Sequence, residues 1–188
     1  MTLLREGLGE LGLTVLSFNY AYTEKGSKRP DPPGRLLEVH RAAADFLSER
    51  VDTVVLAGRS MGGRIGLYLA AEGWDAAGVV LYAYPLHPAG KPETLRIDRF
   101  ADVTVPMLFF QGTRDALARM DLFDRYVRPL PNATVEILEG ASHSPKGGGW
   151  TPESTAKHLS ERTAGWISGT VAPRRGTGHG VRGTADDD

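Results

Sequence analysis

Cysteine is absent from the 188-residue chain. Its absence excludes disulfide bonds, cysteine-ligated zinc, iron–sulfur clusters and a thiol nucleophile. A chain without cysteine also suits a reducing compartment. We therefore expect a cytoplasmic protein.

The chain also lacks a strong charge of either sign and a long hydrophobic run. Lys plus Arg total 22 and Asp plus Glu total 23, giving a net charge of -1. This balance provides no electrostatic attraction to nucleic acid or anionic lipid. No apolar run approaches the roughly 18–20 residues of a membrane span, and the first residues do not resemble a signal peptide. We expect a small-molecule substrate and no nucleic-acid or membrane partner, and nothing indicates a protein partner.

Short apolar runs alternate with helical patterns along the chain. The expected strands are 13–18, 53–57, 78–83, 106–110 and 134–138, and the expected helices are 2–11, 36–50, 61–72, 118–127 and 153–167. The expected strands are short and rich in Val, Leu and Ile, as in a parallel sheet that is buried on both faces. We predict an α/β fold with a mostly parallel sheet and helices on both faces.

The end of the chain differs from the rest. Residues 169–188 are rich in Gly, Arg and Asp and show no apolar period. We therefore expect one domain over residues 1–168, followed by a disordered tail.

The segment Gly58-Arg59-Ser60-Met61-Gly62 lies between an expected strand and an expected helix. Gly-x-Ser-x-Gly in this context is typical of a nucleophile elbow, in which the serine occupies a sharp turn. We expect glycine at both Gly58 and Gly62 because a side chain at either position would clash in that turn. The Met61 N–H, at the helix start, is expected to face a developing oxyanion.

A serine nucleophile needs a base within hydrogen-bond reach. His143 follows the last expected strand, at the sheet edge where the site residues of open α/β sheets gather. Asp115 follows the preceding strand and would orient the imidazole there. The order Ser60, Asp115, His143 is that of α/β-hydrolases. The alternatives are an ordinary loop histidine and an aspartate that caps the following helix.

Two features beside the elbow are candidate pocket walls. Tyr84, Leu86 and His87 lie in a Pro-rich loop and either line a substrate pocket or form a surface turn. Arg59 and Arg64 flank the serine and either hold an anionic substrate, pair with a carboxylate or face solvent.

The elbow has a rival interpretation as a dinucleotide-binding loop. Gly58-x-Ser60-x-x-Gly63 differs by one residue from Gly-x-Gly-x-x-Gly. The residue that differs is the glycine that lets the backbone approach a pyrophosphate, and the next strand does not end near an acidic residue. We expect no organic cofactor and no metal.

Several segments together resemble a known family. They are Gly58-Arg-Ser-Met-Gly-Gly63, Tyr84-Pro-Leu-His-Pro88, Gly90-Lys-Pro92, Gln111-Gly-Thr-Arg-Asp115 and Ser142-His-Ser144. They are similar to small α/β-hydrolases of the testis-expressed-protein-30-like group, relatives of the dienelactone-hydrolase-like hydrolases, over about residues 2–168. The resemblance implies Ser60 as nucleophile, Asp115 as acid and His143 as base. It implies hydrolysis of an ester, thioester or amide through an acyl-enzyme.

The chain departs from this group at its start. Relatives carry an earlier strand, placed between those matching 13–18 and 53–57, and a His-Gly-rich loop that supplies a second oxyanion donor. The printed sequence has neither, so we expect an N-terminally short α/β-hydrolase fold. A start further upstream, a non-catalytic remnant, or another segment filling the gap would each explain this. The competing functional hypothesis is a non-catalytic interaction protein, because losing one oxyanion donor costs about 10²–10³ in kcat.

Overall fold

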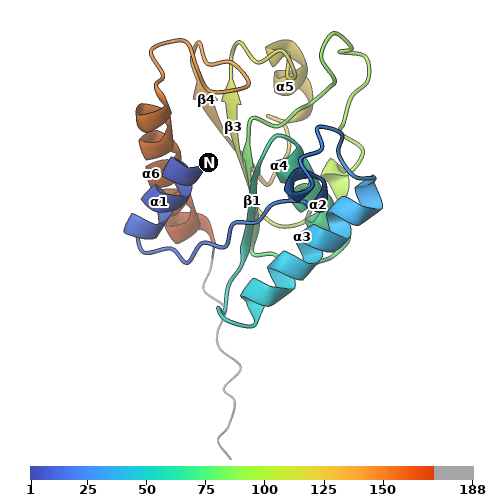
Figure 1. Cartoon of the computed structure of the whole chain (residues 1–188). Coiled ribbons are helices and arrows are strands. Elements are labelled where there is room, and N and C mark those ends of the chain that lie inside the picture. The colour runs from blue at the N-terminus through green and yellow to red at the C-terminus, as the bar shows by residue number, and fades with distance from the viewer. Residues whose placement is uncertain (172–188) are drawn as a thin grey trace, which may run out of the picture.

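A parallel four-stranded sheet forms the centre of the molecule. The computed structural model describes residues 1–171. The strands are β1 (Val55–Arg59), β2 (Gly78–Tyr82), β3 (Met107–Gly112) and β4 (Ala133–Leu138), in the spatial order β1-β2-β3-β4 (Figure 1). Every neighbouring pair is parallel. All four carboxyl ends therefore lie along one edge of the sheet, which is where the candidate site residues were expected.

Helices cover both faces of this sheet, as predicted. The helices are α1 (Thr2–Glu10), α2 (Ala21–Glu24), α3 (Pro33–Ser48), α4 (Met61–Ala71), the 3₁₀ helix η1 (Phe100–Asp102), α5 (Met120–Tyr126) and α6 (Pro152–Thr170). Figure 1 shows α1 and α6 together on one side, and α3 and α4 on the other. The structure therefore confirms an α/β fold of three layers.

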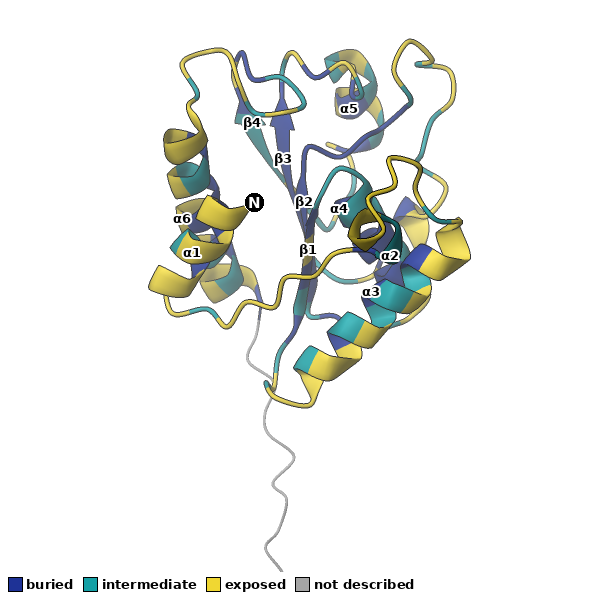
Figure 2. Ribbon diagram, viewed as in Figure 1, coloured by how far each residue is buried: buried dark blue, intermediate teal, exposed yellow. Residues whose placement is uncertain are grey.

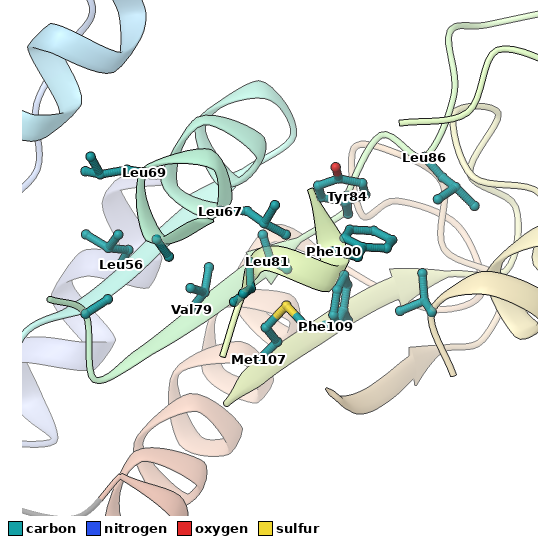
Figure 3. Close-up of a cluster of buried hydrophobic side chains, with 14 of the residues drawn as sticks. Leu56, Leu67, Leu69, Val79, Leu81, Tyr84, Leu86, Phe100, Met107 and Phe109 are labelled. Atoms are coloured by element: carbon teal, nitrogen blue, oxygen red, sulfur yellow. The ribbon is translucent and has the colours of Figure 1, made fainter. Parts of the chain in front are cut away.

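Side chains alternate between two hydrophobic layers along the strands. Val79 and Leu81 of β2 pack on the α4 side, and Figure 3 shows them among apolar side chains of β3, α4 and η1. Val80 and Tyr82 point to the opposite side and pack against α1 and α6. Since both faces are covered, every residue of β2 is buried, and Figure 2 shows the central strands as the most buried part of the fold.

The prediction of a strand at residues 13–18 was wrong. These residues carry no β-ladder, and Val15, Leu16 and Phe18 are 37–38% exposed. A strand needs a hydrogen-bonded neighbour, and within residues 1–171 no strand pairs with the outer edge of β1. A cavity of about 340 Å³ is lined by this segment and by β1. The apolar sequence alone therefore does not make this segment a strand.

Other boundaries shift by a few residues. The helix expected at 118–127 is α5, which begins at Met120, and α6 continues to Thr170, past the expected domain end at 168. Residues 172–188, most of the expected tail, lie outside the described residues. Within residues 1–171 no helix combines the length and apolar character needed to cross a membrane.

A buried histidine joins the segment after α1 to α3. His40 of α3 is 4% exposed, and its Nδ1 lies 3.0 Å from the Tyr20 hydroxyl in a buried hydrogen bond. The Phe18 ring packs edge-on against the imidazole, with the ring centroids 5.2 Å apart. Burial lowers the pKa of His40 to about 4. His40 is therefore neutral at pH 7 and belongs to the packing between these elements.

Candidate functional site

Ser60 occupies a strained turn between β1 and α4. Its backbone angles are φ 53° and ψ -119°, and among residues 1–171 only Ala83 is another non-glycine residue with positive φ. The Ser60 N–H donates to the Tyr82 carbonyl at 2.9 Å, which ties the turn to the end of β2. Such a conformation costs about 1–3 kcal/mol and persists only where its surroundings hold it. This is the geometry expected of a nucleophile elbow.

The turn is tight because two glycines bring their backbones together. A Cβ on Gly58 would lie 2.4 Å from the Gly62 carbonyl carbon and from the Gly63 nitrogen, and a Cβ on Gly63 would lie 2.6 Å from the Gly58 oxygen. A Cβ on Gly62 would meet open space. The expectation for Gly58 is confirmed, but the one for Gly62 was wrong. Gly63 supplies the second close approach, because it faces back onto the strand.

Three expected residues from three loops form one hydrogen-bond chain. The Ser60 Oγ lies 2.9 Å from His143 Nε2, and His143 Nδ1 lies 2.8 Å from Asp115 Oδ2. The Asp115 side chain is fully buried, whereas the His143 side chain is 24% exposed. A buried carboxylate, a partly exposed imidazole and a hydroxyl are thus joined by two consecutive hydrogen bonds. The hydroxyl proton of Ser60 can therefore pass directly to His143 Nε2.

The Asp115 carboxylate has donors on both oxygens. The Leu117 N–H donates to Oδ1 at 2.8 Å, and the Gln111 Nε2 amide donates to Oδ2 at 2.8 Å. Burial alone would raise the pKa of the Asp115 carboxyl, but the hydrogen bonds from His143, Leu117 and Gln111 outweigh it and hold that pKa below its usual value. Asp115 is therefore ionised at neutral pH. It does not cap α5, whose N-cap is Arg119.

The loops that carry the acid and the base touch through their backbones. A Cβ on Gly112 would lie 2.3 Å from the Ala141 oxygen, so only glycine allows this approach. The same carbonyl accepts the Arg114 N–H at 2.9 Å. The Thr113 hydroxyl accepts the Gly140 N–H at 2.8 Å. These contacts fix the distance between Asp115 and His143.

Arg59 holds the loop of the base. Its Nη2 donates to the His143 carbonyl at 3.2 Å and to the Ser144 hydroxyl at 2.9 Å. This contact joins the residue before Ser60 to the residues around His143. Arg64 takes a different direction, with its guanidinium carbon 5.9 Å from the centre of the Tyr68 ring.

The structure does not place Tyr84, Leu86 and His87 on a pocket wall. All three are at most 2% exposed, and the Tyr84 hydroxyl donates to the Arg96 carbonyl at 2.8 Å. His87 Nδ1 lies 2.8 Å from the Pro88 oxygen, and Nε2 accepts the Arg119 N–H at 3.1 Å. Both bonds require neutral imidazole with the proton on Nδ1. The expectation failed because this loop folds inward, and its side chains pack in the core with those of α4 and α5.

A cavity of about 300 Å³ is lined by residues of α1, α6 and the loop of the base, and its lining does not include Ser60 or His143 themselves. Arg59, Ser142 and Ser144 border it near His143. The apolar part of its lining includes Leu3, Leu4, Tyr82, Phe110, Leu138 and Leu159. Met61 is the first residue of α4, so its N–H has no acceptor within the helix and remains a candidate oxyanion donor. In residues 1–171 no group of three or more His, Asp or Glu side chains is arranged to hold a metal.

Sequence reasoning missed two contacts in this site. It did not predict the hydrogen bond from Gln111 to Asp115, nor the close contact of Gly63 with the Gly58 backbone at the elbow. Gln111 had a signal in the sequence, because it is a polar residue that directly follows the apolar run of β3. Gly63 had no comparable signal in the sequence, since its close contact joins helix α4 to strand β1.

Comparisons with known proteins agree with this fold. The fold is similar to that of an esterase domain from Rhodothermus marinus, with a TM-score of 0.66 and 20% identity over 91% of this chain and 80% of the other. A monoacylglycerol lipase from Paleococcus ferrophilus matches with a TM-score of 0.64 and 16% identity over 88% and 87%. A dienelactone hydrolase-like promiscuous phosphotriesterase from metagenomic libraries matches with a TM-score of 0.54 and 20% identity over 74% and 63%.

These three structures establish the likeness of the fold. A family model described as an alpha/beta hydrolase domain matches residues 1–168, almost all of the described chain. The chain therefore belongs to the alpha/beta hydrolase family.

Proposed function

We propose that the protein is a serine hydrolase that cleaves carboxylic esters through an acyl-enzyme. The observation that carries this proposal is the continuous hydrogen-bond chain from Ser60 through His143 to the buried Asp115. The motifs around these residues also support membership of the testis-expressed-protein-30-like group.

The reaction has two halves. Ser60 Oγ attacks the ester carbonyl carbon while His143 Nε2 takes the hydroxyl proton, and Asp115 stabilises the imidazolium that forms. The Met61 N–H donates to the oxyanion. His143 then gives its proton to the leaving alcohol, and the acyl group remains on Ser60. Water, deprotonated by His143, attacks the acyl carbon. His143 then returns its proton to Ser60 Oγ as the bond from Oγ to the acyl carbon breaks, which releases the acid and restores the Ser60 hydroxyl.

The cavity beside the site suggests the class of ester. Its apolar wall suits an aliphatic or aromatic group of the substrate, and its border at Ser142 and Ser144 lies next to the base. The esterase and lipase among the structural neighbours are consistent with this substrate class. We therefore favour an ester with one apolar group over a thioester or an amide.

The second candidate is a non-catalytic interaction protein of the same fold. The outer edge of β1, which no strand within residues 1–171 pairs with, favours it, because such an edge can pair with a strand of another chain. The two functions differ in one property, which is whether Ser60 is activated.

A fluorophosphonate probe tests that property without knowledge of the substrate. The parent and Ser48→Ala, which alters an exposed serine at the end of α3, are expected to be labelled, and Ser60→Ala is not. Circular dichroism on the same samples checks folding. A folded parent that resists labelling would contradict the hydrolase proposal and favour the interaction protein.

A further inference from the structure

Gln111 makes an unusual contact with the acid of the site. It is the fifth residue of β3 and is 0% exposed. Its Nε2 donates to Asp115 Oδ2 at 2.8 Å, and His143 Nδ1 lies 2.8 Å from the same oxygen. Two donors thus converge on one carboxylate oxygen. The carboxylate only accepts hydrogen bonds, so the nitrogen of the amide must face it.

The other half of the Gln111 amide has no partner. The Oε1 atom is buried and makes no hydrogen bond among residues 1–171. An unpaired buried acceptor is unfavourable, and an apolar side chain of similar size would avoid that cost. The preceding residues of β3, from Met107 to Phe110, are all apolar. Gln111 is therefore explained by its bond to Asp115 and not by core packing.

We propose that Gln111 is a positioning residue, which fixes the Asp115 carboxylate and thereby the ring plane of His143 for proton transfer from Ser60. This inference rests on the proposed function. The Leu117 N–H holds Oδ1, and Gln111 holds Oδ2. With both oxygens held, the carboxylate cannot rotate about its bond to Cβ, and Oδ2 stays in line with Nδ1.

Gln111 also shares the negative charge of Oδ2. Without its donor, Oδ2 accepts from His143 alone and attracts the imidazolium proton more strongly. The acid limb of the pH–rate profile, which belongs to the coupled Asp115–His143 pair, is then expected to move to higher pH. Other charged or titratable side chains on the surrounding elements stay the same. They are Arg59 on β1, His87 after β2, Arg114 on the acid loop, and Glu139 and Lys146 around the base.

The test replaces Gln111 with Met, which has similar length and no donor. The rate of Ser60 labelling by a fluorophosphonate probe is measured against pH. Gln111→Met is expected to react about tenfold more slowly on the pH plateau, the size typical of one hydrogen bond to a charged group, with its acid limb at higher pH. Leu108→Met, at a buried position of β3 away from the acid, is the matched control and is expected to match the parent.

A change in rate with an unmoved acid limb, or the same change in Leu108→Met, would mean that Gln111 only packs. An unchanged rate would also overturn the inference. If Gln111→Met does not fold, Gln111→Asn provides the same test, because its amide is one methylene too short to reach Oδ2.

A measurement that needs no reaction separates this inference from the proposed function. The low-field proton NMR signal of the His143 Nδ1–H reports its bond to Asp115. We expect it to shift in Gln111→Met and to stay in place in Leu108→Met. If the folded parent is not labelled, the hydrolase proposal fails while this signal still decides whether Gln111 positions the pair. An unshifted signal in Gln111→Met would overturn the positioning role.

Discussion

The buried His40 makes the stability of the protein depend on pH in a calculable way. Its pKa in the folded state is lowered from 6.5 to about 4 by burial. In the unfolded chain the imidazole returns to its usual value, so between these two values the unfolded state binds more protons. Folding stability is therefore complete above about pH 6.5 and is lost as the pH falls towards 4.

The magnitude follows from linkage. Between about pH 7 and about pH 5, this single group is expected to remove about 2 kcal/mol from the free energy of unfolding. The variant that tests this is His40→Asn. Its side-chain oxygen takes the place of Nδ1 opposite the Tyr20 hydroxyl, and the Asn side chain does not titrate. All other titrating groups are shared by the two proteins. The difference between their unfolding free energies therefore isolates His40.

Urea denaturation followed by circular dichroism measures that difference at each pH. At pH 7 the parent is expected to be more stable than His40→Asn, because the smaller side chain leaves a void beside Gly66 and Phe18. At pH 5 this advantage is expected to shrink by about 2 kcal/mol. An advantage of equal size at both pH values would show that His40 is not held neutral in the fold.

Two further predictions concern the elbow and the loop of the base. Gly62→Ala is expected to fold with equal or slightly higher stability, by up to about 1 kcal/mol, because its Cβ meets open space within α4. Gly63→Ala is expected to be destabilised by about 1–3 kcal/mol and to lose probe labelling, because its Cβ would approach the Gly58 oxygen. Thermal unfolding of both variants checks this, and equal melting temperatures would contradict it. Arg59→Lys is expected to keep the fold but to label about tenfold more slowly, since an ammonium cannot reproduce the contacts of Nη2 with His143 and Ser144. An ester substrate distinguishes the roles of Arg59: a lower kcat supports positioning of the base, whereas a raised KM alone would indicate contact with substrate.

The central site was predictable because it depends on topology more than on detail. Ser60, Asp115 and His143 each follow a strand of the parallel sheet, and the carboxyl ends of parallel strands meet at one edge. Small errors in the strand boundaries do not alter that placement. The four strands of the sheet were found for a related reason, since each carries a short run rich in apolar residues, although β1 and β4 are only partly buried.

What the sequence did not reveal depends on contacts between distant segments. Residues 13–18 have the composition of a strand, but a strand exists only beside a partner. Tyr84 and His87 follow a strand in a Pro-rich loop, which resembles a surface turn until tertiary packing buries it. Gly62 and Gly63 are adjacent in the sequence, but only a Cβ on Gly63 would point at the backbone of β1 and clash with it. None of these facts is encoded in local spacing.

The outer edge of β1 has a consequence for how this chain behaves in solution. The backbone groups on that edge meet no strand within residues 1–171, and the neighbouring Val15, Leu16 and Phe18 are partly exposed. Val55–Arg59 contains neither proline nor lysine, which commonly protect an edge from unwanted pairing, and its one charged residue is Arg59 at the end of the strand. Two copies that meet along β1 would extend one sheet into the other and bury these side chains at the same time. If the edge pairs in this way, mass action favours the pair at high protein concentration and the single chain at low concentration.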